Sequence, residues 1–227
     1  APAMVGGGAR ANPGEVSLAH HGVLFLDEFP EFQRRVLEVM REPLESGSVV
    51  ISRANYKTRY PSNFQLVAAM NPCPCGYHGD AAKNCRCTPK QIKRYQDKIS
   101  GPLLDRIDLQ VMLYPLKRGE LHTKGRSPES QGKRKAVCKA RERQHRRQGK
   151  TNSELDNEAL REHCYLEESH IKLLEKAAEK LSLSARAQHR VLKVARTIAD
   201  LEGCEGIEGS HLSEALGFRV FCTQGCI

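Results

Sequence analysis

The sequence lacks any long apolar run, and this absence argues against a membrane-spanning segment. Apolar stretches such as residues 22–26 end at polar or acidic residues, far short of the roughly 20 residues that a bilayer crossing requires. A basic start followed by an apolar segment is also missing, so we expect no secretory signal. The chain opens on Ala1 instead of a methionine, and Ala1 need not be the natural start.

Cysteine is present but too sparse for a disulfide framework. Nine cysteines occur among 227 residues, whereas small secreted domains stapled by disulfides are much richer in cysteine. Without a secretory signal we expect reduced thiols or metal ligands, and a cytoplasmic location. The remaining composition, 39% hydrophobic and 28% charged with a mean hydropathy of −0.54, is typical of a soluble globular chain with one large or two small domains.

Positive charge is concentrated in one stretch of the chain. The formal net charge is +9, and residues 117–150 hold 13 Lys or Arg against three Glu, so the rest of the chain sums to −1. A local basic cluster, unlike a uniform basic bias, suggests a local anionic partner such as nucleic acid or phosphate.

Hydrophobic periodicity predicts an α/β region at the start of the chain. We expect an amphipathic helix over residues 31–44, a hairpin over residues 49–60, and strands at residues 23–26, 64–70 and 109–113. The uninterrupted apolar run at residues 23–26 predicts a strand that is buried on both faces. Thr88 as N-cap, Pro89 at the first helical position and Gln91 closing a capping box predict a helix that runs to about Ile99.

The second half of the sequence predicts helices without strands. We place a domain boundary near Pro115, which gives a first domain over residues 1–114 and a second over residues 115–227. The helices expected in the second domain cover residues 129–148, 156–163, 167–181, 184–202 and 210–217.

The apolar strand at residues 23–26 is followed by two adjacent carboxylates, Asp27 and Glu28. Ligands of open α/β sheets bind at the carboxyl ends of the strands. In a nucleotide hydrolase one carboxylate lies near Mg²⁺ and its neighbour polarises the attacking water. Asp27 and Glu28 suit these two roles. The competing interpretation is an ordinary strand with a polar exit into a loop.

Three further polar residues follow apolar segments in suggestive places. Asn71 ends the strand at residues 64–70, and its amide can donate to a γ-phosphate oxygen and accept from water. Arg106 lies between apolar residues, where it could enter a neighbouring subunit's site as an arginine finger or form a salt bridge with Asp105 or Asp108. Arg186 falls in the first turn of a predicted helix, where a cation opposes the helix dipole unless an anionic ligand binds there.

These pieces, in this order and spacing, resemble the AAA+ ATPases of the magnesium-chelatase group, and within it the bacterial ComM/YifB-like type. The resemblance covers nearly the whole chain. The stretches that carry it are GEVSLAHHGVLFLDEFPEF, REPLESGSVVISRANYKTRYPSNFQLVAAMNPCPCGY, TPKQIKRYQDKISGPLLDRIDL and LSARAQHRVLKVARTIADLEG. It implies a partial AAA+ P-loop-type α/β core with an inserted β-hairpin, followed by an all-α lid domain.

The resemblance also implies roles for the site residues. Asp27 and Glu28 become the Walker B pair, Asn71 sensor 1, Arg106 the trans arginine finger and Arg186 the sensor 2 arginine. The implied cofactors are ATP and Mg²⁺, with Asp27 and Arg186 at the nucleotide and Asp27 at its Mg²⁺. The implied assembly is a homo-oligomer, a hexameric ring.

The sequence departs from the family at one point. No Gly-x-x-x-x-Gly-Lys-Ser/Thr motif occurs among the 227 residues, and residues 6–8 are no substitute because no Lys or hydroxyl follows at the right spacing. We therefore expect the chain to be the C-terminal portion of a longer ATPase, and to be inactive in hydrolysis by itself.

Two C-x-C pairs occur close together, with His78 between them. Their four thiolates, from Cys73, Cys75, Cys85 and Cys87, could hold Zn²⁺ tetrahedrally, and the loop has little apolar content to order it otherwise. Free reduced thiols and disulfides are the alternatives. Relatives differ in these cysteines, so we do not expect catalysis to depend on them.

The basic stretch predicts contact with a phosphate backbone. The residues expected to make it are Lys133, Arg134, Lys135, Lys139, Arg141, Arg143, Arg146 and Arg147. Such binding is salt-dependent and independent of base sequence, and no aromatic residue lies between Pro115 and Lys150 to stack on bases. The alternative is an ordinary solvated helix face.

Three functions follow from these observations. The first is part of a DNA-acting AAA+ motor, a helicase of the branch-migration type found in recombination and natural transformation. The second is a chelatase-type ATPase subunit that remodels a partner enzyme. The third is a non-catalytic module that binds zinc or DNA. The basic stretch and the cysteine loop favour the first.

Overall fold

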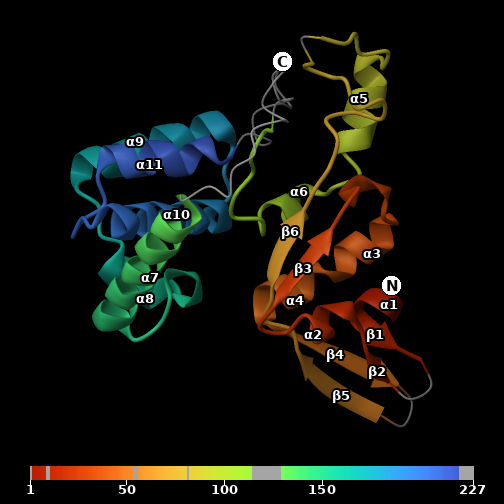
Figure 1. Cartoon of the computed structure of the whole chain (residues 1–227), viewed down its shortest axis with the longest axis horizontal. Coiled ribbons are helices and arrows are strands. Elements are labelled where there is room, and N and C mark those ends of the chain that lie inside the picture. Colours follow the sequence, from red (N-terminus) through yellow and green to blue (C-terminus); the bar gives the residue numbers. More distant parts are fainter. Residues whose placement is uncertain (1, 9–10, 54–55, 81, 114–128, 220–227) are drawn as a thin grey trace. The chain divides into compact units, whose positions relative to one another are not determined.

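The computed structural model describes residues 2–8, 11–53, 56–80, 82–113 and 129–219. The chain divides into two compact units, residues 1–107 and residues 108–227. The first unit mixes short strands with helices, and the second is built from helices (Figure 1). In the described part of the chain, no helix is both long and apolar enough to cross a bilayer.

In the described residues of the first unit there are three sheets of two strands each. Its elements in chain order are α1 (Pro2–Val5), β1 (Gly6–Gly7), β2 (Asn12–Pro13), α2 (Glu15–Leu18), β3 (Val23–Leu26), η1 (Phe29–Glu31), α3 (Arg34–Val39), α4 (Arg41–Ser46), β4 (Ser48–Arg53), β5 (Tyr56–Pro61), β6 (Gln65–Ala68), α5 (Pro89–Gln96) and α6 (Gly101–Leu104). The sheets are antiparallel β1–β2, parallel β3–β6 and antiparallel β4–β5.

The predicted hairpin and the predicted helix start are confirmed. β4 and β5 pair in register from Ser48 opposite Pro61 to Arg53 opposite Tyr56. At α5 the Thr88 hydroxyl accepts a hydrogen bond from the Gln91 amide, and the Gln91 side chain accepts one from the Thr88 amide. Both features depend on residues that are neighbours in sequence, so local chemistry suffices to specify them.

The single helix predicted over residues 31–44 is wrong. A short 3-10 turn, η1, precedes α3, and α3 ends at Val39, so that Met40 separates it from α4, which begins at Arg41. Pro43 explains the break, because it lacks the N–H that would donate to Val39 and its ring crowds that carbonyl. Proline is tolerated instead in the first turn of a new helix, which is where α4 places it.

The expectation that β3 is covered on both faces is also wrong for the described residues. Leu24 and Leu26 are buried, whereas Val23 and Phe25 are 60% and 59% exposed. On the partner strand, Val67 lies opposite Phe25 and is 39% exposed. One face of the β3–β6 sheet therefore packs on the core of the first unit, and the other face is an open apolar surface.

The second unit is a helical bundle. Its elements are α7 (Glu129–Gln148), η3 (Asn152–Glu154), α8 (Asn157–His163), α9 (Glu168–Leu181), α10 (Ala185–Glu202) and α11 (Gly209–Gly217). The five predicted helices are confirmed to within a residue or so at each end. Ser184 caps α10 by accepting from the Ala187 amide at 3.1 Å. The buried apolar face of α10, including Val191, Ala195 and Ile198, contributes to the core.

The strand predicted at residues 109–113 does not form. Only Gln110 makes a β-type pair, an isolated bridge to Arg219, while Leu109, Val111 and Leu113 are exposed. The apolar segment that suggested a strand has no second strand to pair with in the described chain. Pro115, near which we placed the domain boundary, lies outside the described residues.

Candidate functional site

The parallel pairing of β3 with β6 defines the candidate site. Val23 lies opposite Gln65 and Leu26 opposite Ala68, so both strands end at the same edge of the sheet. Asp27 and Glu28 follow β3 there, and Asn71 comes three residues after β6. All three residues are exposed. The structure therefore brings the predicted carboxylates and the predicted sensor residue to one edge, where α/β sheets bind ligands.

Glu28 has an unusual backbone conformation. Its φ of 49° and ψ of 43° place it in the left-handed region, which costs a non-glycine residue on the order of 1 kcal/mol or more. Strand pairing surrounds this residue, because the Ala69 amide donates to Leu26 O and the Phe29 amide donates to Ala69 O, each at 2.9 Å. The Glu28 amide in turn donates to the Asp27 carboxylate at 2.8 Å. These bonds fix the backbone of both residues relative to the sheet and orient the Asp27 carboxylate.

Asn71 begins the loop that leads to α5. Its side chain lies beside Gly76, since a Cβ at Gly76 would sit 4.0 Å from the Asn71 amide group. Tyr95 of α5 is buried next to this segment. Burial raises the pKa of Tyr95, and the charges of Glu31 and Glu28 raise it further, against a backbone hydrogen bond with Asn71 that lowers it. The carboxylates of Glu31 and Glu28 are therefore close enough to the Tyr95 hydroxyl to disfavour its ionisation.

Arg106 is buried within the first unit. It follows α6, and its guanidinium forms an ion pair with Glu45 and donates to Pro102 O at 2.6 Å. The Arg106 side chain is 6% exposed and that of Glu45 is 44% exposed. The described state therefore holds this arginine inside its own subunit, by a carboxylate 61 residues earlier in the chain. Of the two partners considered from sequence, Asp108 instead pairs with Arg190 at 2.6 Å.

Arg186 lies in the first turn of α10 and is exposed. It belongs to the second compact unit, so the structure does not group it with Asp27, Glu28 and Asn71. Its predicted role as sensor 2 stays a prediction.

The four predicted thiols come together in the loop between β6 and α5. We refer to Cys73, Cys75, Cys85 and Cys87 as the four-cysteine cluster. The Sγ atoms of Cys73 and Cys75 are 3.4 Å apart, those of Cys73 and Cys85 3.7 Å, and those of Cys75 and Cys85 3.6 Å. All four sulfur atoms lie within 4.8 Å of one another. Each of these cysteines is free.

The cluster strongly perturbs its own thiol chemistry. A backbone hydrogen bond from Tyr77, followed by one from Arg86, lowers the pKa of Cys75 to about 6. Burial, together with the neighbouring thiols, raises the pKa of Cys87 to about 12. The Cys75 thiol is thus readily ionised while the Cys87 thiol resists ionisation, as expected when several thiols share a small site and the first thiolate disfavours a second.

The basic helix α7 is exposed over its first half. From Ser130 to Lys139 every residue is exposed, and the helix first turns a buried side chain, Ala140, toward the bundle after that point. Seven of the predicted phosphate contacts occupy exposed positions: Lys133, Arg134, Lys135, Lys139, Arg141, Arg143 and Arg146. The part of the charged stretch at residues 117–128 lies outside the described residues.

Two of the predicted phosphate contacts, Arg143 and Arg147, donate hydrogen bonds within the bundle. Arg147 donates to the two carboxylate oxygens of Asp200 at 2.6 and 3.0 Å, and Arg143 donates to the Asp200 backbone oxygen at 2.5 Å. Asp200 is 1% exposed and also receives a hydrogen bond from Arg196 at 2.9 Å. Arg143 and Arg147 therefore attach α7 to α10, a role that the charge pattern alone did not reveal.

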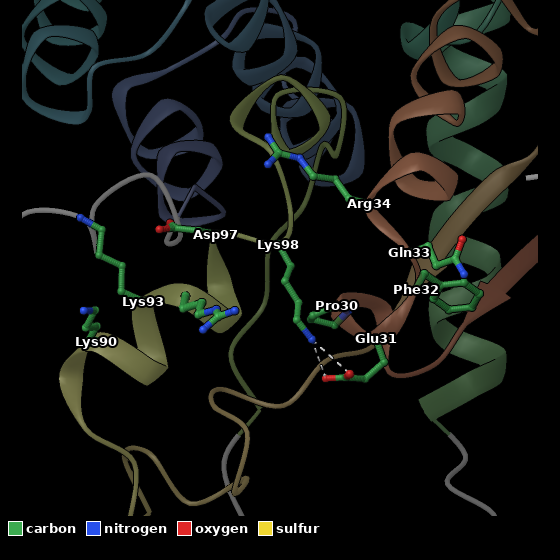
Figure 2. A pocket seen from close by; sticks show the side chains of 10 residues that line it. Pro30, Glu31, Phe32, Gln33, Arg34, Lys90, Lys93, Asp97 and Lys98 are labelled. Atoms are coloured by element: carbon green, nitrogen blue, oxygen red, sulfur yellow. Dashed lines mark hydrogen bonds and ion pairs between the residues drawn. The ribbon is translucent and has the colours of Figure 1, made fainter.

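A basic hollow of about 720 Å³ lies between η1–α3 and α5 (Figure 2). Five cations, Arg34, Lys90, Lys93, Arg94 and Lys98, line it together with Glu31 and Asp97. Lys98 forms an ion pair with Glu31 at 3.1 Å across it. Sequence reasoning missed this site, although the spacing of Lys90, Lys93 and Arg94 by three and four already places them on one face of the helix.

Comparisons with known proteins cover both units. Residues 1–121 match the family model described as magnesium chelatase, subunit ChlI, and residues 127–219 match that of the ChlI C-terminal region. The competence protein ComM of Haemophilus influenzae is 51% identical over 219 residues. The proteins named YifB are 49% identical over 219 residues in Escherichia coli and 48% over 218 in Salmonella typhimurium. Each alignment covers 96% of this chain and 43% of the relative.

Proposed function

This chain belongs to the magnesium chelatase family, and we propose from its site that it forms part of an ATP-hydrolysing AAA+ ring motor that acts on DNA. The observation that carries the proposal is the shared edge of β3 and β6. There the exposed residues Asp27 and Glu28 follow the end of β3, and the exposed Asn71 follows the end of the neighbouring parallel strand β6. Carboxylate oxygens are the ligands that Mg²⁺ prefers, so the donor set fits an ATP–Mg²⁺ site.

The proposed roles follow from the chemistry of each side chain. Asp27 holds the Mg²⁺ that accompanies ATP and neutralises charge on its phosphates. Glu28 accepts a hydrogen bond from the attacking water and orients it. Asn71 donates to the γ-phosphate. Arg186, at the start of α10, contacts the nucleotide from the lid.

Arg106 is proposed to act across a subunit boundary. In the described state it is bound to Glu45, so its use as an arginine finger requires that it exchange this carboxylate for a phosphate of the neighbouring subunit. Contact between Arg106 and a phosphate bound by the neighbouring subunit is possible only in an oligomer. The proposal therefore includes a homo-oligomeric ring, which we propose to be a hexamer.

Glu28→Gln tests the assignment of the water-activating carboxylate. The experiment uses the full-length gene product, because the 227 residues contain no phosphate-binding Gly-x-x-x-x-Gly-Lys motif. We expect ATP affinity to be retained and turnover to fall by about 100-fold or more, the usual contribution of a positioned base. Glu42→Gln, an exposed carboxylate in the first turn of α4, is the matched control. Normal turnover in the Glu28 variant would refute the assignment.

Mixed rings test the trans role of Arg106. We expect Arg106→Ala subunits to bind ATP normally but to hydrolyse it slowly, and wild-type subunits added to them to restore part of the activity. If the isolated variant subunit loses ATP binding, Arg106 contacts nucleotide in its own subunit and the trans assignment is wrong.

The proposed DNA contact rests on the exposed first half of α7. Neutralising phosphates releases counterions, so the logarithm of affinity falls with the logarithm of salt by a slope of about 0.9 per phosphate contacted. We expect Lys135→Ala/Lys139→Ala to lower that slope by about 2, one contact for each lysine. Lys176→Ala/Lys180→Ala is the matched control, because it removes the same charge at the same spacing from an exposed face of α9.

Two outcomes of the DNA experiment would count against the proposal. If the two double variants lower the salt slope of DNA affinity equally, then DNA binding depends on net charge and not on α7. Absence of salt-dependent DNA binding by the wild-type protein would favour the alternative, in which the same ATPase parts remodel a partner enzyme as in a chelatase.

A further inference from the structure

We propose that the four-cysteine cluster binds one Zn²⁺ ion as a closed structural site that holds the loop between β6 and α5. The proposal concerns a part of the chain that lies outside the carboxylate edge, and it does not depend on ATP hydrolysis.

The sulfur positions fit a tetrahedral thiolate site. A Zn–S bond of about 2.3 Å in tetrahedral geometry separates neighbouring sulfur atoms by about 3.8 Å. The measured separations among Cys73, Cys75 and Cys85 are 3.4, 3.6 and 3.7 Å, and Cys87 completes the set within 4.8 Å. Four ligands from protein leave no open position, which is the pattern of a structural site.

The arrangement does not suit disulfides. A disulfide brings two sulfur atoms to about 2.05 Å and directs each toward a single partner. Here the sulfur of Cys73 has two near neighbours, Cys75 and Cys85, and these two are also close to each other. Three mutually adjacent sulfur atoms are the corners of a coordination site.

Hydrophobic burial does not account for the order of this loop. Within residues 71–80 and 82–88 the structure assigns neither helix nor strand, and the single buried side chain is that of Cys73. A segment without an apolar core requires another source of order, and metal coordination supplies it directly as folding free energy.

The backbone around the thiols forms a tight turn and directs an N–H group at one of the sulfur atoms. The Gly76 amide donates to Cys73 O at 3.0 Å, which closes a tight turn, and Gly76 accommodates the turn with a φ of 81°. The Cys87 amide donates to Cys85 Sγ at 3.4 Å. Amide donors of this kind stabilise the charge of ligating sulfur and fix its orientation.

The other candidate metal group of the described chain is explained without a metal. Glu202, Cys204 and His211 lie close together. However, His211 accepts from the Glu208 amide at 2.9 Å and pairs with Glu202 at 3.1 Å, so both ring nitrogens already have protein partners. The four-cysteine cluster differs because its sulfur atoms contact mainly one another.

The proposed ion would join the two ends of the loop. Cys73 stands two residues after Asn71, and Cys87 immediately precedes Thr88, the N-cap of α5. Gln96 adds a second tie by donating to Pro72 O at 3.1 Å. Coordination would therefore close residues 74–86 into a loop whose base is fixed between the sheet edge and α5.

Metal content of the full-length protein tests the site. We expect wild-type protein produced with added zinc to carry one zinc ion per chain at the cluster. Cys85→Ser/Cys87→Ser should lower the zinc content by about one ion per chain, and Cys138→Ser, an exposed thiol on α7, should leave it unchanged. The same zinc content in wild-type protein and in the double variant would overturn the proposal.

Measurements on the wild-type protein keep the proposal testable if the double variant fails to fold. We expect Zn²⁺ to protect four thiols from alkylation until a strong chelator is added, and Co²⁺ to give the visible absorption bands of tetrahedral thiolate coordination. Chelation should also open residues 74–86 to proteolysis. Free alkylation of all four thiols in zinc-supplemented protein, or two disulfides in its intact mass, would refute the zinc site while leaving the ATPase proposal untouched.

Discussion

Asp200→Asn probes the contact that holds α7 against α10. The Asp200 carboxylate accepts from both Arg147 and Arg196, and also from the side-chain Nδ2 of Asn152 at 2.9 Å. The substitution preserves the shape of the side chain but removes its charge and gives it an N–H₂ group that faces other donors. Arg196, whose side chain is 2% exposed, then remains buried without a counter-charge.

The expected cost follows from the burial of the two arginines. Removing one partner of a buried ion pair costs about 3–5 kcal/mol. Arg147 keeps 25% exposure and can recover some hydration, so we take a value near the lower end, about 3 kcal/mol. With a urea dependence of about 1–2 kcal/mol per molar for a unit of this size, the unfolding midpoint should fall by about 2 M.

Far-UV circular dichroism during urea unfolding measures this change, because the second unit is helical. Glu168→Gln is the control, since its ion pair with Lys172 is highly exposed on both sides and should contribute too little to resolve. An unchanged midpoint in the Asp200 variant would refute the view that the network secures α7. It would also mean that Arg147 is available to contact a phosphate backbone.

Three further predictions concern single contacts. Glu45→Ala should lower the free energy of unfolding of the first unit by about 2 kcal/mol, because the buried Arg106 guanidinium loses its carboxylate partner; a urea titration that shows no change would contradict this. Burial would raise the pKa of Asp200, but hydrogen bonds from Arg147 and its neighbours outweigh burial and lower it below the usual 3.8. The ionised Asp200 carboxylate should therefore contribute fully to the free energy of unfolding above about pH 4, and this contribution should be lost as the pH falls through the folded-state pKa. In acid unfolding experiments, Asp200→Asn should consequently lose less stability than the wild type. Thr88→Ala should destabilise the first unit by about 1 kcal/mol through loss of the N-cap, and an unchanged thermal midpoint would argue that the capping box is dispensable.

The features that could be predicted from the sequence are those that nearby residues specify. The Thr88 capping box, the hairpin around residues 49–60 and the Ser184 cap all depend on contacts within a few residues. The break between α3 and α4 near Met40 is also specified locally, by Pro43. It was not predicted because the apolar positions continue with helical spacing across the break. The positions of Asp27 and Asn71 after apolar segments could also be predicted, but the parallel pairing of β3 with β6 that brings them to one edge joins residues far apart in the sequence.

The features that could not be predicted depend on partners far apart in the sequence. Arg106 pairs with Glu45, 61 residues away, and Arg147 with Asp200, 53 residues away. A basic residue in a charged run looks the same in sequence whether it faces solvent or a buried carboxylate. Arg147 bonds to Asp200 and Lys135 faces solvent only because of the way α7 packs on α10. No local sequence pattern distinguishes the two residues.

The open face of the β3–β6 sheet has a practical consequence for measuring assembly. Val23 and Phe25 present adjoining apolar surface, and surfaces of this kind adhere to one another without any specific geometry. Light scattering from the 227-residue chain could then report adhesion through this face instead of subunit contacts through Arg106. A ring size is therefore meaningful only where the measured mass is unaffected by Phe25→Thr and stays constant on dilution.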